Sequence, residues 1–160
     1  MAKKGKPFEI PSPLFGKVFY NRLAEVAKNE YRKITFDKSN PKMANKQPFP
    51  KYKSKSYQNR KQTNKLKRQD SSYANSTAPV VTGDLMLDTK ASAAPKENAI
   101  YIGWSSHAYK LDHLRTNKRI LTSKAYPINP DVIKKIMPSF NKHLKKTMPK
   151  GSQTITIGKK

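Results

Sequence analysis

The chain of 160 residues contains no cysteine, and its 10 acidic residues stand against 34 Lys and Arg, so that the formal net charge is +24. The absence of cysteine excludes disulfides, thiolate metal sites and cysteine nucleophiles together. No apolar stretch approaches the roughly 18 residues that a membrane-spanning helix requires. Glu9, Pro11 and Pro13 lie where a signal peptide needs an apolar run. We therefore expect a soluble protein that is made inside the cell and has no membrane partner.

The sequence also lacks the motifs of common enzymes and of proteins that read nucleic-acid sequence. Its six glycines are scattered and form no phosphate-binding loop, and its three histidines show no metal-ligand spacing. No zinc-finger, RNP or GXXG signature is present. Asp84 and Asp88 could act as an acid pair or hold magnesium, but pairing with nearby lysines is the favoured interpretation. We therefore expect no catalytic residues, no metal site and no cofactor.

The most distinctive feature that is present is a run of ten Lys and Arg, without a single acid, between Lys42 and Arg68. Such self-repulsion calls for counter-charge from nucleic acid, anionic lipid or an acidic protein surface, although a solvated basic loop is the simpler alternative. Lysine predominates, which suits sequence-independent phosphate contact better than base reading. The residues that we expect to contact a polyanion are Lys51, Lys53, Lys55, Arg60, Lys61, Lys65, Lys67 and Arg68.

The N-terminal part of the chain predicts one long helix. Residues 1–12 form a polar arm, and Ser12 followed by Pro13 is typical of a helix start. Apolar residues then recur at helical spacing, which predicts a helix over 13–33, and residues 34–36 have the composition of a short strand. The expected buried face of the helix consists of Leu14, Phe15, Val18, Phe19, Leu23, Val26, Ala27 and Tyr31.

Residues 37–79 have the composition of a long basic insertion. Three prolines indicate a loop over 37–53. Residues 54–68 can form a helix but lack an apolar face, so that such a helix would be exposed or would lie against something charged. Residues 69–79 are rich in Ser, Asn and Ala, a composition that indicates a linker.

A second structured half begins at Val80. Residues 82–88 predict a turn or short helix that leads into a strand, residues 95–98 predict a turn, and residues 99–104 predict a further strand because they combine β-branched and aromatic side chains. Residues 106–116 form a helix or an ordered loop in this interpretation.

The C-terminal part predicts another helix. Asn129, Pro130 and Asp131 are a strong helix start, and Pro138 inside the following apolar pattern predicts a kink or break. Residues 149–160 form a basic tail, in which residues 154–157 alternate like a strand that could join a neighbour's sheet. We therefore expect one domain over 13–148, with arms at both ends.

The order of these signals resembles that of a known family. An aromatic and proline-bearing segment with a lysine-rich helix spans Gln47–Lys61, a TG-x-L turn follows at Thr82–Leu85, and a strand ending in Ile-Gly follows at Ile100–Gly103. Together with the C-terminal helix, this order resembles the tail-completion, or virion-morphogenesis, neck proteins of tailed bacteriophages. The resemblance covers about residues 14–145.

The resemblance implies a fold and a function. The fold is α+β, with a small antiparallel sheet flanked by an N-terminal helix and a C-terminal helix and with long basic loops and arms. The function is that of a structural subunit in a homo-oligomeric ring of the virion, which joins the head portal to the tail and contacts portal, adaptor and tail proteins. Double-stranded DNA passes through the lumen, so the lysines would face DNA or acidic neighbouring subunits.

Two other functions account for parts of the same sequence. A sequence-independent nucleic-acid-binding protein of the ribosomal type would share the charge, the basic tails and the small size. A nuclease that uses Asp84, Asp88 and Asp112 accounts for the least, because the chain offers no nucleophile or phosphate loop beside these carboxylates.

Overall fold

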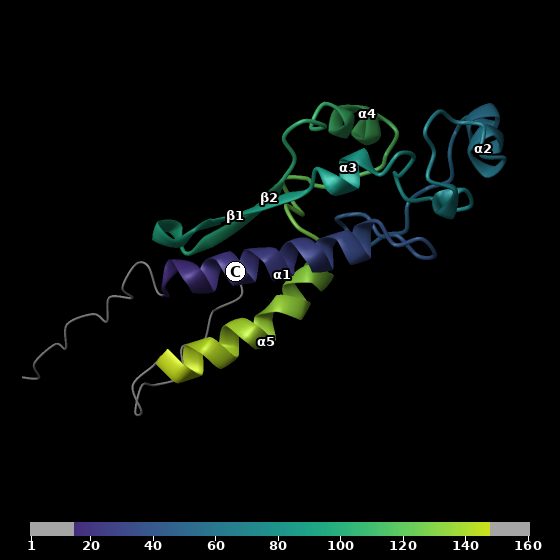
Figure 1. Cartoon of the computed structure of the whole chain (residues 1–160). Helices are drawn as coiled ribbons and strands as arrows, with labels where there is room; N and C mark the ends of the chain where they lie inside the picture. The colour runs from purple at the N-terminus through teal and green to yellow at the C-terminus, as the bar shows by residue number, and fades with distance from the viewer. Residues whose placement is uncertain (1–14, 148–160) are drawn as a thin grey trace, which may run out of the picture.

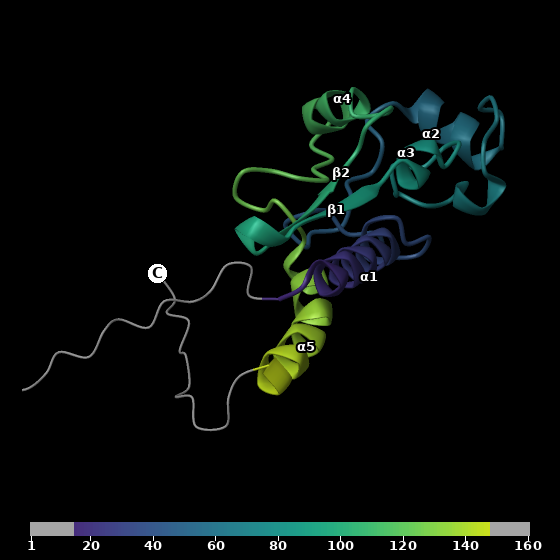
Figure 2. The same cartoon turned by 60° about the vertical axis from the view of Figure 1, so that its left-hand side comes forward.

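A computed structural model describes residues 15–147, and the arms expected at 1–12 and 149–160 lie outside this range. Its main elements are two long helices, α1 (Lys17–Thr35) and α5 (Pro130–Thr147), and an antiparallel hairpin of β1 (Lys90–Ala94) and β2 (Ala99–Gly103). The hairpin lies along one side of α1 and α5 lies along the other (Figure 1). Figure 2 shows the same order of layers from a second direction. The predicted α+β class, with a small antiparallel sheet and helices at both ends of the chain, is confirmed.

Helix α1 is the centre of this arrangement. It begins after Gly16, which is extended and provides no side-chain cap, and the predicted start at residues 12–13 lies outside the described residues. The helix continues to Thr35, so the strand predicted at 34–36 is wrong. Its buried face includes Leu23 and Tyr31 as predicted, but Val18 is 67% exposed and Val26 is 43% exposed. These two valines lie on the solvent side of the helix, although their spacing had placed them on the buried face.

The hairpin follows the predicted order of turn, strand, turn and strand. The short helix α3 (Asp84–Leu87) leads into β1, and the 3-10 turn η2 (Pro95–Glu97) joins β1 to β2. Residues Lys90 and Gly103 are paired at the open end, and Ala94 and Ala99 are paired beside the turn. The predicted strand at 99–104 and the predicted turn at 95–98 are therefore confirmed.

Helix α5 begins as its sequence predicts. The Oδ1 atom of Asn129 accepts a hydrogen bond from the backbone N–H of Asp131 at 2.8 Å, and its Nδ2 atom donates to the carbonyl of Met43 at 2.8 Å. Asn129 thus caps the helix and ties it to the loop after α1. The helix continues through Pro138, so of the predicted kink or break the break is wrong.

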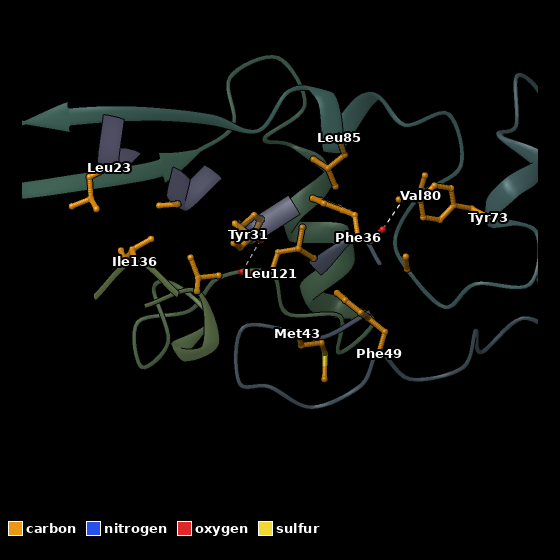
Figure 3. Packing of buried hydrophobic residues seen from close by; sticks show 13 residues of the cluster. Leu23, Tyr31, Phe36, Met43, Phe49, Tyr73, Val80, Leu85, Leu121 and Ile136 are labelled. Atoms are coloured by element: carbon orange, nitrogen blue, oxygen red, sulfur yellow. Dashed lines mark hydrogen bonds between the residues drawn. The ribbon is translucent and has the colours of Figure 1, made fainter. Parts of the chain in front are cut away.

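The core joins segments that are far apart in the chain, as Figure 3 shows. The Tyr31 hydroxyl donates to the carbonyl of Leu121 at 3.1 Å, and the Tyr73 hydroxyl donates to the carbonyl of Phe36 at 2.7 Å. Tyr73 belongs to the 3-10 turn η1 (Ser71–Tyr73), inside the predicted linker. The buried cluster consists of Leu23, Ala27, Tyr31, Phe36, Met43, Phe49, Tyr73, Ala78, Val80, Leu85, Leu121, Val132 and Ile136.

This core corrects the interpretation of residues 37–79 as an insertion with a linker. Phe49, Tyr73 and Ala78 are at most 5% exposed, so this stretch supplies part of the main core. Of the regular elements in this stretch, only α2 (Lys55–Gln62) is polar on nearly all sides, as predicted for 54–68. Among the described helices, none has the length and apolarity needed to cross a membrane.

Candidate polyanion-binding surface

Seven of the eight predicted polyanion-binding residues lie on the surface. Within residues 15–147, none of the seven forms an ion pair, whereas Lys42 and Lys46 earlier in the basic run both approach Asp131, at 3.8 and 3.4 Å. Figure 1 places α2, which carries part of this set, at one end of the molecule and away from α5. The exposed residues are Lys51, Lys53, Lys55, Arg60, Lys65, Lys67 and Arg68.

The eighth residue, Lys61, is buried, so the prediction that it contacts a polyanion at the surface is wrong. Its side chain is 1% exposed, and its ammonium group donates to the carbonyl of Ser76 at 2.7 Å, to the carbonyl of Ala78 at 3.2 Å and to the Tyr52 hydroxyl at 2.8 Å. Burial, together with the nearby charge of Arg119, lowers the pKa of Lys61 to about 8. The ammonium group of Lys61 can be buried because it keeps its hydrogen bonds. Two backbone carbonyls and the Tyr52 hydroxyl, rather than a carboxylate, accept the bonds that water would accept at the surface.

Arg119 is a second buried cation in the same place, and no pattern in the sequence singles it out. It is 4% exposed, and its terminal nitrogens donate to the carbonyl of Thr77 at 2.6 Å and to the carbonyl of Pro50 at 2.5 Å. Its guanidinium carbon lies 3.9 Å from the centroid of the Tyr52 ring. Burial raises the pKa of Tyr52 to about 12. We call Tyr52, Lys61 and Arg119 the Tyr52 cluster.

The Tyr52 cluster fixes the exposed cations to the core. Lys61 is part of α2, and through its contacts this helix is bound to residues 76–78. Arg119 connects the chain before α2, at Pro50, to the same stretch through Thr77. The seven exposed cations are therefore presented by a folded scaffold rather than by a solvated loop.

A groove of about 600 Å³ opens beside these cations. Residues 51–57 form one wall as they enter α2, residues 79–86 form another around the start of α3, and residues 109–119 on and after α4 (Lys110–Thr116) form the third. We call it the Tyr57 groove, after the half-buried tyrosine in its first wall.

The two carboxylates predicted to pair with lysines, Asp84 and Asp88, accept hydrogen bonds from other groups. Asp88 accepts hydrogen bonds from the backbone N–H groups of residues 105–107 and from the Ser105 hydroxyl, and the N–H of His107 is the main reason that its pKa falls to about 2. Asp84 accepts from the Thr82 hydroxyl at 2.5 Å, which lowers the pKa of Asp84. Asp112 forms an exposed pair with Arg115 at 3.2 Å.

Each of the three carboxylates thus has a local structural role. In the described part of the chain, no group of three or more His, Cys, Asp or Glu side chains is placed to hold a metal ion. No protein-family model, curated protein or solved structure matches this chain. The cationic surface is therefore the main guide to function.

Proposed function

We propose that the chain is a structural subunit of the ring that joins the head portal to the tail of a tailed bacteriophage. In this proposal the exposed cations of residues 51–68 face passing DNA or the acidic surfaces of neighbouring subunits. The observation that carries the proposal is the set of seven exposed cations without an ion pair in the described chain, held on a scaffold that the Tyr52 cluster fixes to the core. The order of motifs along the sequence supports the phage family.

The chemistry of these cations suits a surface that DNA passes. Five of the seven are lysines, which act as point charges on phosphate and carry little base specificity. Neutralising phosphates releases counterions, and this contribution does not depend on sequence. A ring lumen needs such contacts because the whole genome must move through it without stopping at any one sequence.

The hairpin supports assembly into a ring. In the described residues β1 and β2 pair only with each other, so each strand has an outer edge without a strand partner. Exposed edges offer backbone N–H and C=O groups to another chain, and a two-stranded sheet is marginally stable by itself. Tyr101 on β2 is 53% exposed. A neighbouring subunit that covers this region would extend the sheet or shield the tyrosine.

Ring formation is tested on protein stripped of nucleic acid by nuclease and high salt. We expect light scattering during size-exclusion chromatography to give the mass of a closed oligomer, and negative-stain images to show rings. A monomeric mass at every protein concentration would overturn the proposal that the chain forms a ring. If that monomer also bound structured RNA more tightly than duplex DNA across a salt series, the same cationic surface would belong to a nucleic-acid-binding protein of the ribosomal type.

A further inference from the structure

The lining of the Tyr57 groove combines two chemical properties. Its cations Lys51, Lys53, Lys110 and Arg119 face a single carboxylate, that of Asp84. The rest of the lining is largely apolar, with three tyrosines and five aliphatic residues. The aliphatic residues are Pro79, Val81, Leu85, Met86 and Leu114. A concave apolar surface with a cationic rim selects a ligand that is apolar in the middle and negative at its ends.

We propose that the Tyr57 groove binds an acidic peptide segment of a partner protein. One large apolar side chain of that segment packs on the aliphatic lining, and its carboxylates lie against Lys51, Lys53 and Lys110. A volume of about 600 Å³ accommodates one aromatic side chain together with the adjoining backbone. Such a segment would bind whether the chain works in a ring or alone. An experiment can therefore contradict peptide binding without contradicting the proposed ring, and the reverse.

Charge excludes this chain's own arms as the occupant. Residues 1–14 contain three lysines and one acid, and residues 148–160 contain three lysines and no acid. Either arm would bring further positive charge to a lining that already has four cations against one carboxylate. An acidic segment of a different protein has the complementary charge, and like charges at an interface suppress the wrong partner.

The aliphatic part of the lining favours a peptide over a nucleic acid. Single-stranded nucleic acid binds by stacking its bases on aromatic faces along a cationic track. Of the three tyrosines in the lining, Tyr52 already has the Arg119 guanidinium against its ring and Tyr57 is half-buried. Lys110 lies 5.9 Å from the centroid of the third ring, that of the exposed Tyr109. The aliphatic part of the lining, which consists of Leu, Val, Met and Pro side chains, resembles the apolar pockets that anchor peptide side chains.

The groove is formed before any ligand arrives. Ser54 caps α2 by accepting a hydrogen bond from the N–H of Tyr57 at 3.1 Å, and Arg119 at the opposite wall is held by two backbone carbonyls. Gly83 precedes α3 with a φ of 80°, a conformation that side-chain-bearing residues rarely adopt. Walls that are fixed in advance reduce the entropy lost on binding.

The test uses the full chain and a fluorescein-labelled peptide in which one central phenylalanine is flanked on both sides by glutamates. Two matched probes replace the phenylalanine by alanine or the glutamates by glutamine. Fluorescence anisotropy at physiological salt measures each dissociation constant. We expect each replacement to weaken binding by about tenfold or more, because each removes one of the two properties that the groove recognises.

Charge-reversal variants locate the binding site. Lys53→Glu with Lys110→Glu changes the lining, whereas Lys65→Glu with Lys67→Glu changes the net charge equally outside it. We expect the first pair to weaken the phenylalanine probe by about tenfold and the second by less than about twofold, with unchanged circular dichroism for both. The same pairs are compared with a single-stranded oligonucleotide as competitor.

Three results would overturn the proposal. The first is equal loss of affinity in both variant pairs, which would indicate general charge attraction. The second is equal binding of the phenylalanine and alanine probes, or no saturable binding up to about 1 mM. The third is an oligonucleotide that displaces the peptide and loses affinity only with Lys53→Glu and Lys110→Glu, which would assign the groove to nucleic acid.

Discussion

The guanidinium group of Arg119 lies against the ring of Tyr52, with 3.9 Å between the guanidinium carbon and the ring centroid. The hydroxyl of the same tyrosine accepts a hydrogen bond from Lys61 and donates one to the carbonyl of Ala78 at 2.9 Å. Two cations thus share one half-buried aromatic ring without a carboxylate partner. Backbone carbonyls accept hydrogen bonds from both cations, so the cluster links residues 50–52, α2 and residues 76–78 into one unit.

Arg119→Lys is expected to destabilise the fold although the charge is kept. A lysine ammonium cannot reach the carbonyls of both Thr77 and Pro50 with the planar geometry of a guanidinium. Loss of one hydrogen bond to a charged group predicts a decrease of about 1.5–3 kcal/mol in the free energy of unfolding. Urea unfolding measures it, with the exposed Arg115→Lys as control. Equal effects of the two substitutions would contradict this role of Arg119.

The stability contribution of Lys61 is expected to depend on pH. Its pKa falls from 10.5 to about 8 on folding, so above pH 8 the unfolded chain keeps a proton that the folded chain releases. Stability linked to Lys61 therefore rises with pH in the window between these values. Relative to Lys61→Met, the wild-type free energy of unfolding should increase by roughly 1–2 kcal/mol from about pH 7 to about pH 9.5. A constant or falling difference would contradict the buried position.

The substitution Asp88→Asn tests how stability depends on pH in the acidic range. The folded pKa of about 2 lies below the ordinary 3.8, so the stabilisation is fully present above pH 3.8 and is lost as the pH falls through 2. We expect Asp88→Asn to lower Tm at neutral pH, because the amide turns a donor toward the N–H groups of residues 105–107. The Tm difference should shrink toward pH 2. Asp112→Asn, at a side chain that is 83% exposed, serves as the control and should change Tm little at any pH.

Side-chain burial on α1 separates residues that the sequence pattern had grouped. Leu23 is 8% exposed and Val18 is 67% exposed, and Ile102 on β2 is partly buried against the core. We expect Leu23→Ala to cost about 2–4 kcal/mol, Ile102→Ala less than Leu23→Ala, and Val18→Ala less than about 0.5 kcal/mol. Denaturant unfolding gives all three values. A large effect at Val18 in the isolated subunit would show that α1 packs through its other face.

The elements that the sequence predicted well are those with strong local signals. The helical spacing from Phe15 to Tyr31, the β-branched run at residues 99–104 and the Asn-Pro-Asp helix start each depend on neighbours in the chain. The linker predicted at 69–79 was wrong because its polar composition outweighed Tyr73 and Ala78, which belong to the same buried cluster as residues of α1. The Tyr73 hydroxyl bonds the carbonyl of Phe36, 37 positions earlier. In the sequence, the large aromatic side chain of Tyr73 within a Ser/Asn stretch was the only indication that this segment is buried.

The site was less predictable than the fold. Lys61 lies in a run of cations that are otherwise exposed, and its partners are backbone carbonyls, which leave no trace in the sequence. Arg119 approaches Pro50 across 69 positions, so its role is decided by tertiary packing alone. The Tyr57 groove likewise depends on three walls that are distant in the chain. The exposure of the other seven cations, by contrast, followed from composition.

The most direct test of the central claim, that the exposed cations of residues 51–68 lie against a polyanion, is the salt dependence of duplex DNA binding. In one variant, glutamine replaces the seven exposed cations of this segment, which are Lys51, Lys53, Lys55, Arg60, Lys65, Lys67 and Arg68. A matched variant removes seven exposed charges elsewhere, at Lys17, Lys124, Lys134, Lys135, Lys142, Lys145 and Lys146. Lys61 stays in both, so that the Tyr52 cluster is intact.

We expect the slope of log K against log salt to flatten by about one for each phosphate that the first variant no longer neutralises, and to change little in the second. Both variants should keep the wild-type circular dichroism spectrum. A first variant with the wild-type slope, or equal flattening in the two variants, would contradict the claim that this segment is the polyanion-binding surface.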